Sequence, residues 1–237
     1  IYHYNYDLNM NLLSTTSIFS FYTLISRVLG YVRDILIAIF LGASIFADAF
    51  FVAFRIPNTF RRLFAEGTFN AAFVPSYTSE NIKGKNYSQK FADEVFNLLL
   101  ISLLFIVLLA EIFTPFLVYL IAPGFFSNSE KFNLAIELTR ITFPFLLFVS
   151  ISSFFAGILN SNNKFAAAAA APIILNLILI LALFVAYFFG LNYTKVLSYS
   201  VFFSGVIQLL FLVYFSRKYY FPRVKLRYNF TYKVKSF

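Results

Sequence analysis

The sequence contains no cysteine and no tryptophan, and its 237 residues include one histidine, one methionine and eight glycines. Without cysteine there is no disulfide framework and no thiolate metal site. The single histidine, His3, rules out histidine-based metal sites and catalysis. No glycine-rich phosphate-binding loop is present, and no aspartate-rich motif suits a magnesium–diphosphate complex. The sequence therefore offers no recognisable enzyme chemistry.

Charged residues are scarce as well, at 12% of the chain, against about 25% in soluble domains. Hydrophobic residues make up 60%, with 35 phenylalanines and 16 tyrosines, and the mean hydropathy is +0.78. This composition excludes a soluble domain. It predicts an integral membrane protein.

Six segments are long and apolar enough to cross a bilayer, which takes about 20 residues of helix. They cover residues 12–43, 45–66 with an extension toward 79, 91–121, 134–159, 165–189 and 194–215. Pro115 is expected to kink the third segment near its end. We therefore expect an all-α integral membrane protein with about six transmembrane helices.

The domain organisation follows from the same pattern. The apolar run begins after Met10, the sole methionine, while residues 1–9 are polar and aromatic without periodicity. We expect 1–9 to be upstream read-through or disordered, 10–219 to form one six-helix transmembrane lobe, and 220–237 to form a basic cytoplasmic connector. No soluble domain can be placed.

Loop charges predict the orientation. With the N-terminus inside, the cytoplasmic loops and tail hold eleven lysines and arginines, and the opposite loops hold only Lys131 and Lys195. The positive-inside rule then places the N-terminus and the tail in the cytoplasm. The net charge of +9 indicates contact with anionic lipid headgroups rather than with nucleic acid.

Residues 26–75 place many charges within otherwise apolar segments. They are Arg27, Arg33, Asp34, Asp48, Arg55, Arg61, Arg62 and Glu66. A charge at the bilayer centre costs about 2.5–3.5 kcal/mol or more. These side chains must therefore face a protein-lined or water-filled cavity.

On the second segment the polar residues share one helical stripe. Its members are Asp48, Arg55, Asn58, Arg62 and Glu66, with Arg61 beside it. Five arginines against three acids leave a positive excess in the region, and the planar guanidinium fork suits phosphate. We expect a site for an anionic, phosphate-bearing substrate. The alternative, internal pairing that fixes helix register, is open for any single arginine, but three acids cannot neutralise all five.

Other polar residues within the spans have structural explanations. Glu137 and Arg140 are spaced as an i, i+3 ion pair. Asn160, Asn176 and Gln208 are expected to make interhelical hydrogen bonds.

The stretches SRVLGYVRD, LGASIFADAFFVAFRIPN and RRLFAEGTFNAAFVP carry a specific resemblance, supported by FPFLLFVSISSFFAGILNSNNKFAAAAAAPIILN. Over residues 10–230 the chain resembles the MurJ (MviN) family, the bacterial lipid II flippases of the multidrug/oligosaccharidyl-lipid/polysaccharide exporter superfamily. The resemblance covers the N-terminal lobe of a two-lobed transporter with a central cationic cavity and alternating access.

The resemblance implies roles for single residues. Arg33 and Arg61 match arginines that grip the substrate diphosphate. The same cavity is implied for Arg27, Asp34, Arg55, Asn58 and Arg62. Gating or charge-pairing roles are implied for Ser26, Gly30, Asp48 and Glu66, with Gly30 as a bend in the first helix.

The resemblance also implies partners and location. The substrate would be lipid II, an undecaprenyl-diphosphate-linked disaccharide-pentapeptide, flipped across the bacterial cytoplasmic membrane. Family members have about fourteen helices, so a second lobe or a second copy is needed for the cycle. No cofactor is implied in this chain, and any coupling-ion site is expected in the second lobe.

Two alternatives stay open. One is an exporter of a different undecaprenyl-diphosphate-linked glycan, with the same architecture. The other is a membrane enzyme acting on polyprenyl diphosphates, although no metal or nucleophile constellation supports it. The cost of burying five arginines disfavours a purely structural scaffold.

Overall fold

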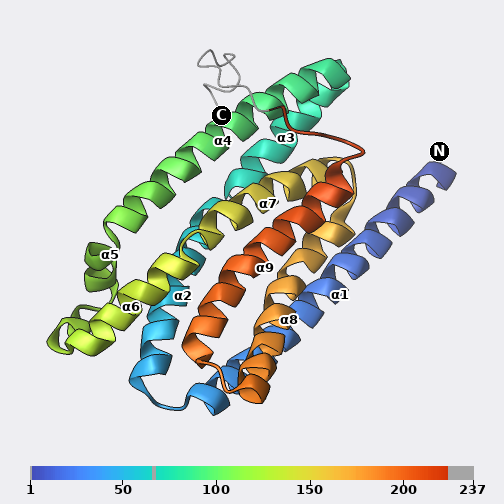
Figure 1. The fold of residues 1–237 in the computed structure, drawn as a ribbon. Coiled ribbons are helices and arrows are strands. Elements are labelled where there is room, and N and C mark those ends of the chain that lie inside the picture. The colour runs from blue at the N-terminus through green and yellow to red at the C-terminus, as the bar shows by residue number, and fades with distance from the viewer. Residues whose placement is uncertain (1, 66–67, 224–237) are drawn as a thin grey trace.

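The computed structural model describes residues 2–65 and 68–223, and their side chains over 17–59 and 69–223. This described part is helical and contains no strand. Figure 1 shows the helices as a bundle. They are α1 (Tyr2–Leu41), α2 (Ile45–Ala65), α3 (Thr68–Lys83), α4 (Lys85–Ile112), α5 (Thr114–Ile121), the 3₁₀ helix η1 (Pro123–Ser127), α6 (Ser129–Thr142), α7 (Phe145–Ser161), α8 (Phe165–Phe189) and α9 (Tyr193–Ser216).

The prediction of an all-α membrane-spanning fold is confirmed. In the described part of the chain, four helical stretches have the length and hydropathy to cross a bilayer. They are Lys85–Ile112, Ser129–Ser161, Phe165–Phe189 and Tyr193–Ser216. The other two of the six expected segments correspond to α1 and α2. Both helices are long enough to span a bilayer, but they carry the charged residues between 27 and 62. The expected interruption near Pro115 is present, since α4 ends before Phe113 and α5 begins at Thr114.

Helix α1 is a 40-residue helix that packs along α8 at one edge of the bundle (Figure 1). It runs unbroken through Gly30 and ends where Gly42 takes a left-handed φ of 58°, a conformation that glycine adopts at little cost. Residues 2–9 belong to its backbone. The expectation that residues 1–9 precede the natural start stays a prediction.

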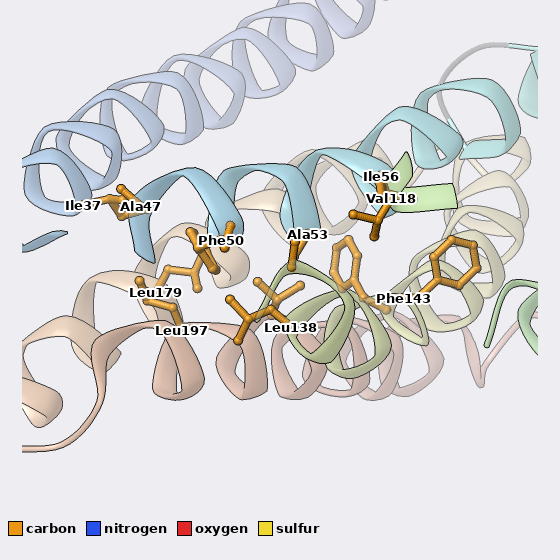
Figure 2. Packing of buried hydrophobic residues seen from close by; sticks show 14 of the residues in the cluster. Ile37, Ala47, Phe50, Ala53, Ile56, Val118, Leu138, Phe143, Leu179 and Leu197 are labelled. Atoms are coloured by element: carbon orange, nitrogen blue, oxygen red, sulfur yellow. The ribbon is translucent and has the colours of Figure 1, made fainter. Parts of the chain in front are cut away.

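Two hydrophobic clusters hold the bundle together. One gathers α2, α6, α8 and α9 around Phe50, Ala53, Leu138 and Leu197, each fully buried (Figure 2). Thr142 donates a buried hydrogen bond of 2.8 Å to the carbonyl of Ala53, which joins α6 to α2. The second cluster packs α3, α4, α7 and α9 through aromatic rings. One side of α2 is therefore packed against the other helices, and its opposite side is not covered by them.

After α9 the chain turns back and lies against α4. Tyr220 is only 2% exposed, and its ring meets Phe154 edge-on at 5.5 Å between centroids. Its hydroxyl donates to Asp93 Oδ1 at 2.8 Å, and the same oxygen accepts the amide N–H of Arg223 at 3.1 Å. Burial, followed by the hydrogen bond to Asp93, raises the pKa of Tyr220 well above its usual range, so the hydroxyl remains a donor. Residues 217–223 therefore form a strap anchored to α4.

The strap yields a first prediction. Tyr220→Phe removes one hydrogen bond while keeping the buried ring, which should cost about 0.5–1.5 kcal/mol. Hydrogen exchange at the Arg223 amide should accelerate, because its acceptor Asp93 loses the tyrosine that orders it. Hydrogen exchange with mass spectrometry would measure the change. The control is Tyr199→Phe, on an exposed α9 tyrosine, which should leave that amide unaffected. Equal acceleration in both variants would contradict the anchoring role.

Candidate functional site

Arg33 occupies the junction of α1, α2 and α8. Its Nε and Nη2 both donate to Asp34 Oδ1, at 2.9 and 2.7 Å, and its Nη1 donates to Asn176 Oδ1 at 2.7 Å. Its guanidinium carbon lies 5.6 Å from the ring centroid of Phe54 on α2. The side chain is 14% exposed. The guanidinium is therefore held from three sides.

Asn176 is the residue that fixes this arrangement. Its side-chain amide accepts from Arg33 and donates to the backbone carbonyl of Ser26 at 2.8 Å. Gly30 lies beside this amide, and a Cβ placed on it would stand 3.5 Å from Asn176 Nδ2, an ordinary van der Waals contact. The expectation of an interhelical hydrogen bond at Asn176 is confirmed. Its partner Arg33 could not be named beforehand, because Asn176 lies 143 residues away in sequence.

The guanidinium retains binding capacity. An arginine has five N–H groups, and three of those on Arg33 meet Asp34 or Asn176. The other two have no acceptor within the described part of the protein. Its ion-pair partner Asp34 is 59% exposed. Arg33 is thus a fixed cation with free donors near the surface of the lobe.

The charged stripe of α2 lies on the side that the bundle leaves uncovered. Arg55 and Asp48 are exposed and Asn58 is half-buried, whereas Phe50, Ala53 and Ile56 on the opposite side are buried. Arg27 on α1 is exposed in the same way. Among the described residues, no carboxylate lies within ion-pair distance of Arg27 or Arg55. Because charges avoid hydrocarbon, this uncovered face requires a polar space next to it.

Asp48 has a partner that the sequence did not indicate. Its carboxylate pairs with Lys131 on α6, and Lys131 Nζ also lies 4.2 Å from the ring centroid of Phe125. Lys131 is one of only two basic residues in the loops opposite the predicted cytoplasmic side, which is the signal that could have drawn attention to it. The pair joins the start of α2 to the start of α6.

One expected ion pair is wrong. Glu137 does not pair with Arg140 but with Lys195 at the start of α9, at 2.8 Å. The i, i+3 spacing placed the two side chains on one face of α6, but helix packing supplied Glu137 with a partner from α9.

Three expected site residues cannot be placed in this geometry. Arg61 and Arg62 fall in α2 at positions whose side chains lie outside the described residues, and Glu66 lies outside them altogether. Ser26, Gly30, Arg33 and Asp34 are brought together on α1, where Ser26 contributes its carbonyl rather than its hydroxyl. Over the residues that were described, no group of three His, Cys, Asp or Glu side chains could hold a metal ion.

Comparison with known proteins decides the family. The family model described as lipid II flippase MurJ matches residues 37–237. The chain belongs to the MurJ family. A solved MurJ structure, "Lipid II flippase MurJ, inward closed conformation", is similar with a TM-score of 0.73 and 30% identity, covering 92% of this chain and 44% of that one.

Curated MurJ proteins from several bacteria are close in sequence. "Probable lipid II flippase MurJ" of Rhizobium tropici is 47% identical over 192 residues, which is 79% of this chain and 36% of the relative. The protein of the same name from Rickettsia prowazekii is 41% identical, over 86% of this chain and 40% of the relative. "Lipid II flippase MurJ" of Burkholderia cenocepacia is 38% identical, over 85% and 39%. The chain spans about two fifths of the length of these relatives, which are named as transporters rather than enzymes.

The Asn176 network yields a second prediction. Asn176→Leu keeps the side-chain size but removes the hydrogen bonds to Arg33 Nη1 and to the Ser26 carbonyl, which should destabilise the lobe by about 1–3 kcal/mol. The thermal midpoint of the detergent-purified chain should fall. Asn133→Leu, at an exposed asparagine of α6, is the matched control and should leave the midpoint nearly unchanged. A midpoint that Asn176→Leu does not lower would show that the network contributes little.

Proposed function

We propose that this chain is the N-terminal lobe of a transporter that flips lipid II across the bacterial cytoplasmic membrane, and that the uncovered face of α1 and α2 binds the substrate diphosphate. The observation that carries the proposal is the Arg33 guanidinium. It is held by Asn176, Asp34 and Phe54 with two N–H groups left over. Membership of the MurJ family supplies the substrate class.

A diphosphate suits this face on electrostatic grounds. Arg27 on α1 and Arg55 on α2 are exposed, and their positive charge is not cancelled by a described carboxylate. Arginine cannot lose its proton at physiological pH, and its fork matches phosphate oxygens. Arg61 and Arg62 belong to the same stretch of sequence and are proposed to complete the site. Asp34 and Asp48 would then limit the net charge and hold the arginines apart.

The charged face of α1 and α2 needs a second structural element opposite it to form a closed cavity. The charged sides of α1 and α2 are not covered by the other helices described, and alternating access requires one bundle to rock against another. We propose that a second lobe, or a second copy of this chain, closes the cavity. Any coupling ion would bind in that other half. The orientation with the N-terminus and the basic tail in the cytoplasm is proposed from the distribution of basic loop residues.

A chimera tests the proposal. The chain replaces the matched N-terminal segment of the Burkholderia cenocepacia flippase, in cells depleted of their own copy. The chimera should support growth. Arg33→Ala and Arg61→Ala should each abolish growth, with lipid II accumulating, because losing a charge-assisted contact to phosphate weakens binding by about tenfold or more. Arg33→Lys should retain part of the activity, since it keeps the charge and loses the fork.

The controls separate binding from assembly. Lys85→Ala removes an exposed basic residue of α4, away from this face, and should leave growth unchanged. Membrane levels of all variants are compared by immunoblot. If both alanine variants still support growth at equal levels, the assigned roles are wrong. If the depleted cells accumulate a different lipid-linked glycan that the chimera clears, the substrate is not lipid II.

A further inference from the structure

A second cationic feature lies at the end of the bundle where α8 begins and α9 ends (Figure 1), apart from the arginine face. It is a pocket of about 500 Å³ between α1, the α7–α8 connection and the start of the strap. Its lining residues are Ile18, Leu159, Asn163, Lys164, Phe165, Ala166, Ala167, Tyr214, Phe215, Arg217, Lys218 and Tyr219. Neither the flipping cycle nor the diphosphate site accounts for this pocket.

The charge of the pocket has one sign. Lys164, Arg217 and Lys218 are its only ionised lining residues, and all three are exposed. Within the described residues, none of them lies within ion-pair distance of a carboxylate. Arg217 is held in place by Tyr214, with its guanidinium carbon 4.1 Å from the ring centroid. The positive charge of the pocket therefore favours binding of an anion.

The backbone at the pocket adds to this preference. Helix α8 begins at Phe165, and Lys164, which precedes it, makes no side-chain hydrogen bond to its first turn. A lysine cannot accept such a bond, so the first N–H groups of a 25-residue helix remain without a side-chain cap beside the three cations. The positive end of the helix dipole acts in the same sense as the side chains. This contribution supplements that of the cationic side chains.

The rest of the lining is apolar. Ile18, Phe215 and the first alanines of α8 form the walls, and the fully buried Leu159 closes the inner end. Because α8 and α9 are two of the four spanning helices, the start of one and the end of the other lie at the membrane surface. A ligand that uses the whole pocket must carry an anionic head and a hydrocarbon tail. A free phosphate ion would leave the apolar walls unused.

We propose that this pocket binds an anionic glycerophospholipid of the surrounding leaflet. The headgroup phosphate lies among Lys164, Arg217 and Lys218, and an acyl chain follows Ile18 and Phe215 toward the bilayer core. The bound lipid would fix the relative positions of α1, α8 and α9 at this end. Asn176 on α8 holds Arg33 on α1, so the same pair of helices carries both features. This inference does not depend on the transported substrate.

Native mass spectrometry of the 237-residue chain in a neutral detergent tests the proposal. The probes are phosphatidylglycerol and phosphatidylcholine with the same acyl chains. Phosphatidylglycerol should bind more tightly, and Lys164→Gln with Lys218→Gln should weaken its binding roughly 30-fold, at about fivefold for each charge removed near an anionic lipid. Binding of phosphatidylcholine should change by less than about twofold, since its headgroup has no net charge.

A matched variant and a rescue variant keep the test decisive. Lys85→Gln with Lys90→Gln removes two exposed lysines of α4 outside the pocket and should leave phosphatidylglycerol binding nearly unchanged. Lys164→Arg with Lys218→Arg should restore it. Equal losses in both glutamine variants would overturn the proposal by showing that charge acts without a site. No preference for phosphatidylglycerol in the unmodified chain would overturn it by showing that the headgroup charge is not recognised.

Crosslinking locates the bound lipid. Phosphatidylglycerol with a photoactivatable group on its acyl chain should label peptides that contain Ile18, Phe165 or Phe215. Labelling confined to the apolar pocket between Leu109, Phe116 and Phe143 would contradict the assigned position. Undecaprenyl diphosphate should compete poorly. If it displaces the probe at lower concentration and labels the same peptides, the occupant is a polyprenyl diphosphate and the proposal is wrong.

Discussion

The fixed position of Arg33 is the constraint on which the arrangement of this lobe depends. A guanidinium at this depth cannot shed its charge, and exposure to hydrocarbon would cost several kcal/mol. The guanidinium is instead contacted by a side-chain amide from α8, the neighbouring carboxylate of Asp34 and an aromatic ring from α2. Gly30 lies on the same stretch of α1, and a Cβ placed on it would stand 3.5 Å from Asn176 Nδ2, an ordinary van der Waals contact. The charge therefore determines how α1, the helix at the edge of the bundle, is oriented against α8.

The two sides of α2 serve different purposes. One side is packed into the cluster around Phe50 and Ala53, and the other carries Asp48 and Arg55 uncovered. The lobe therefore has a packed interior of its own, while its charged side requires a polar neighbour. The ion pair of Asp48 with Lys131 joins the start of α2 to α6, and the strap after α9 is anchored to α4.

Much of the fold could be predicted because the membrane restricts the choices. The segment expected over 165–189 coincides with α8, and the one expected over 194–215 differs from α9 by one residue at each end. The length of an apolar segment suffices for such predictions. Backbone N–H and C=O groups in hydrocarbon must be hydrogen-bonded within the segment, and an α-helix does this. The charged stripe was also predictable from helical periodicity alone, and its described part lies on the uncovered side of α2. Arg33 could be singled out from the sequence because a charge within an apolar segment is costly to place in a bilayer.

The sequence by itself determined the membrane class, the helices and which residues needed a polar environment, because these follow from local hydropathy and periodicity. Only the tertiary structure decided the partners. Asn176 reaches Arg33 across 143 residues and Lys131 reaches Asp48 across 83, while Glu137 prefers Lys195 to its neighbour Arg140. The basic pocket likewise combines residues from α1, α8 and α9. Partner choice depends on which helix faces meet, and that is set by packing between segments far apart in the chain.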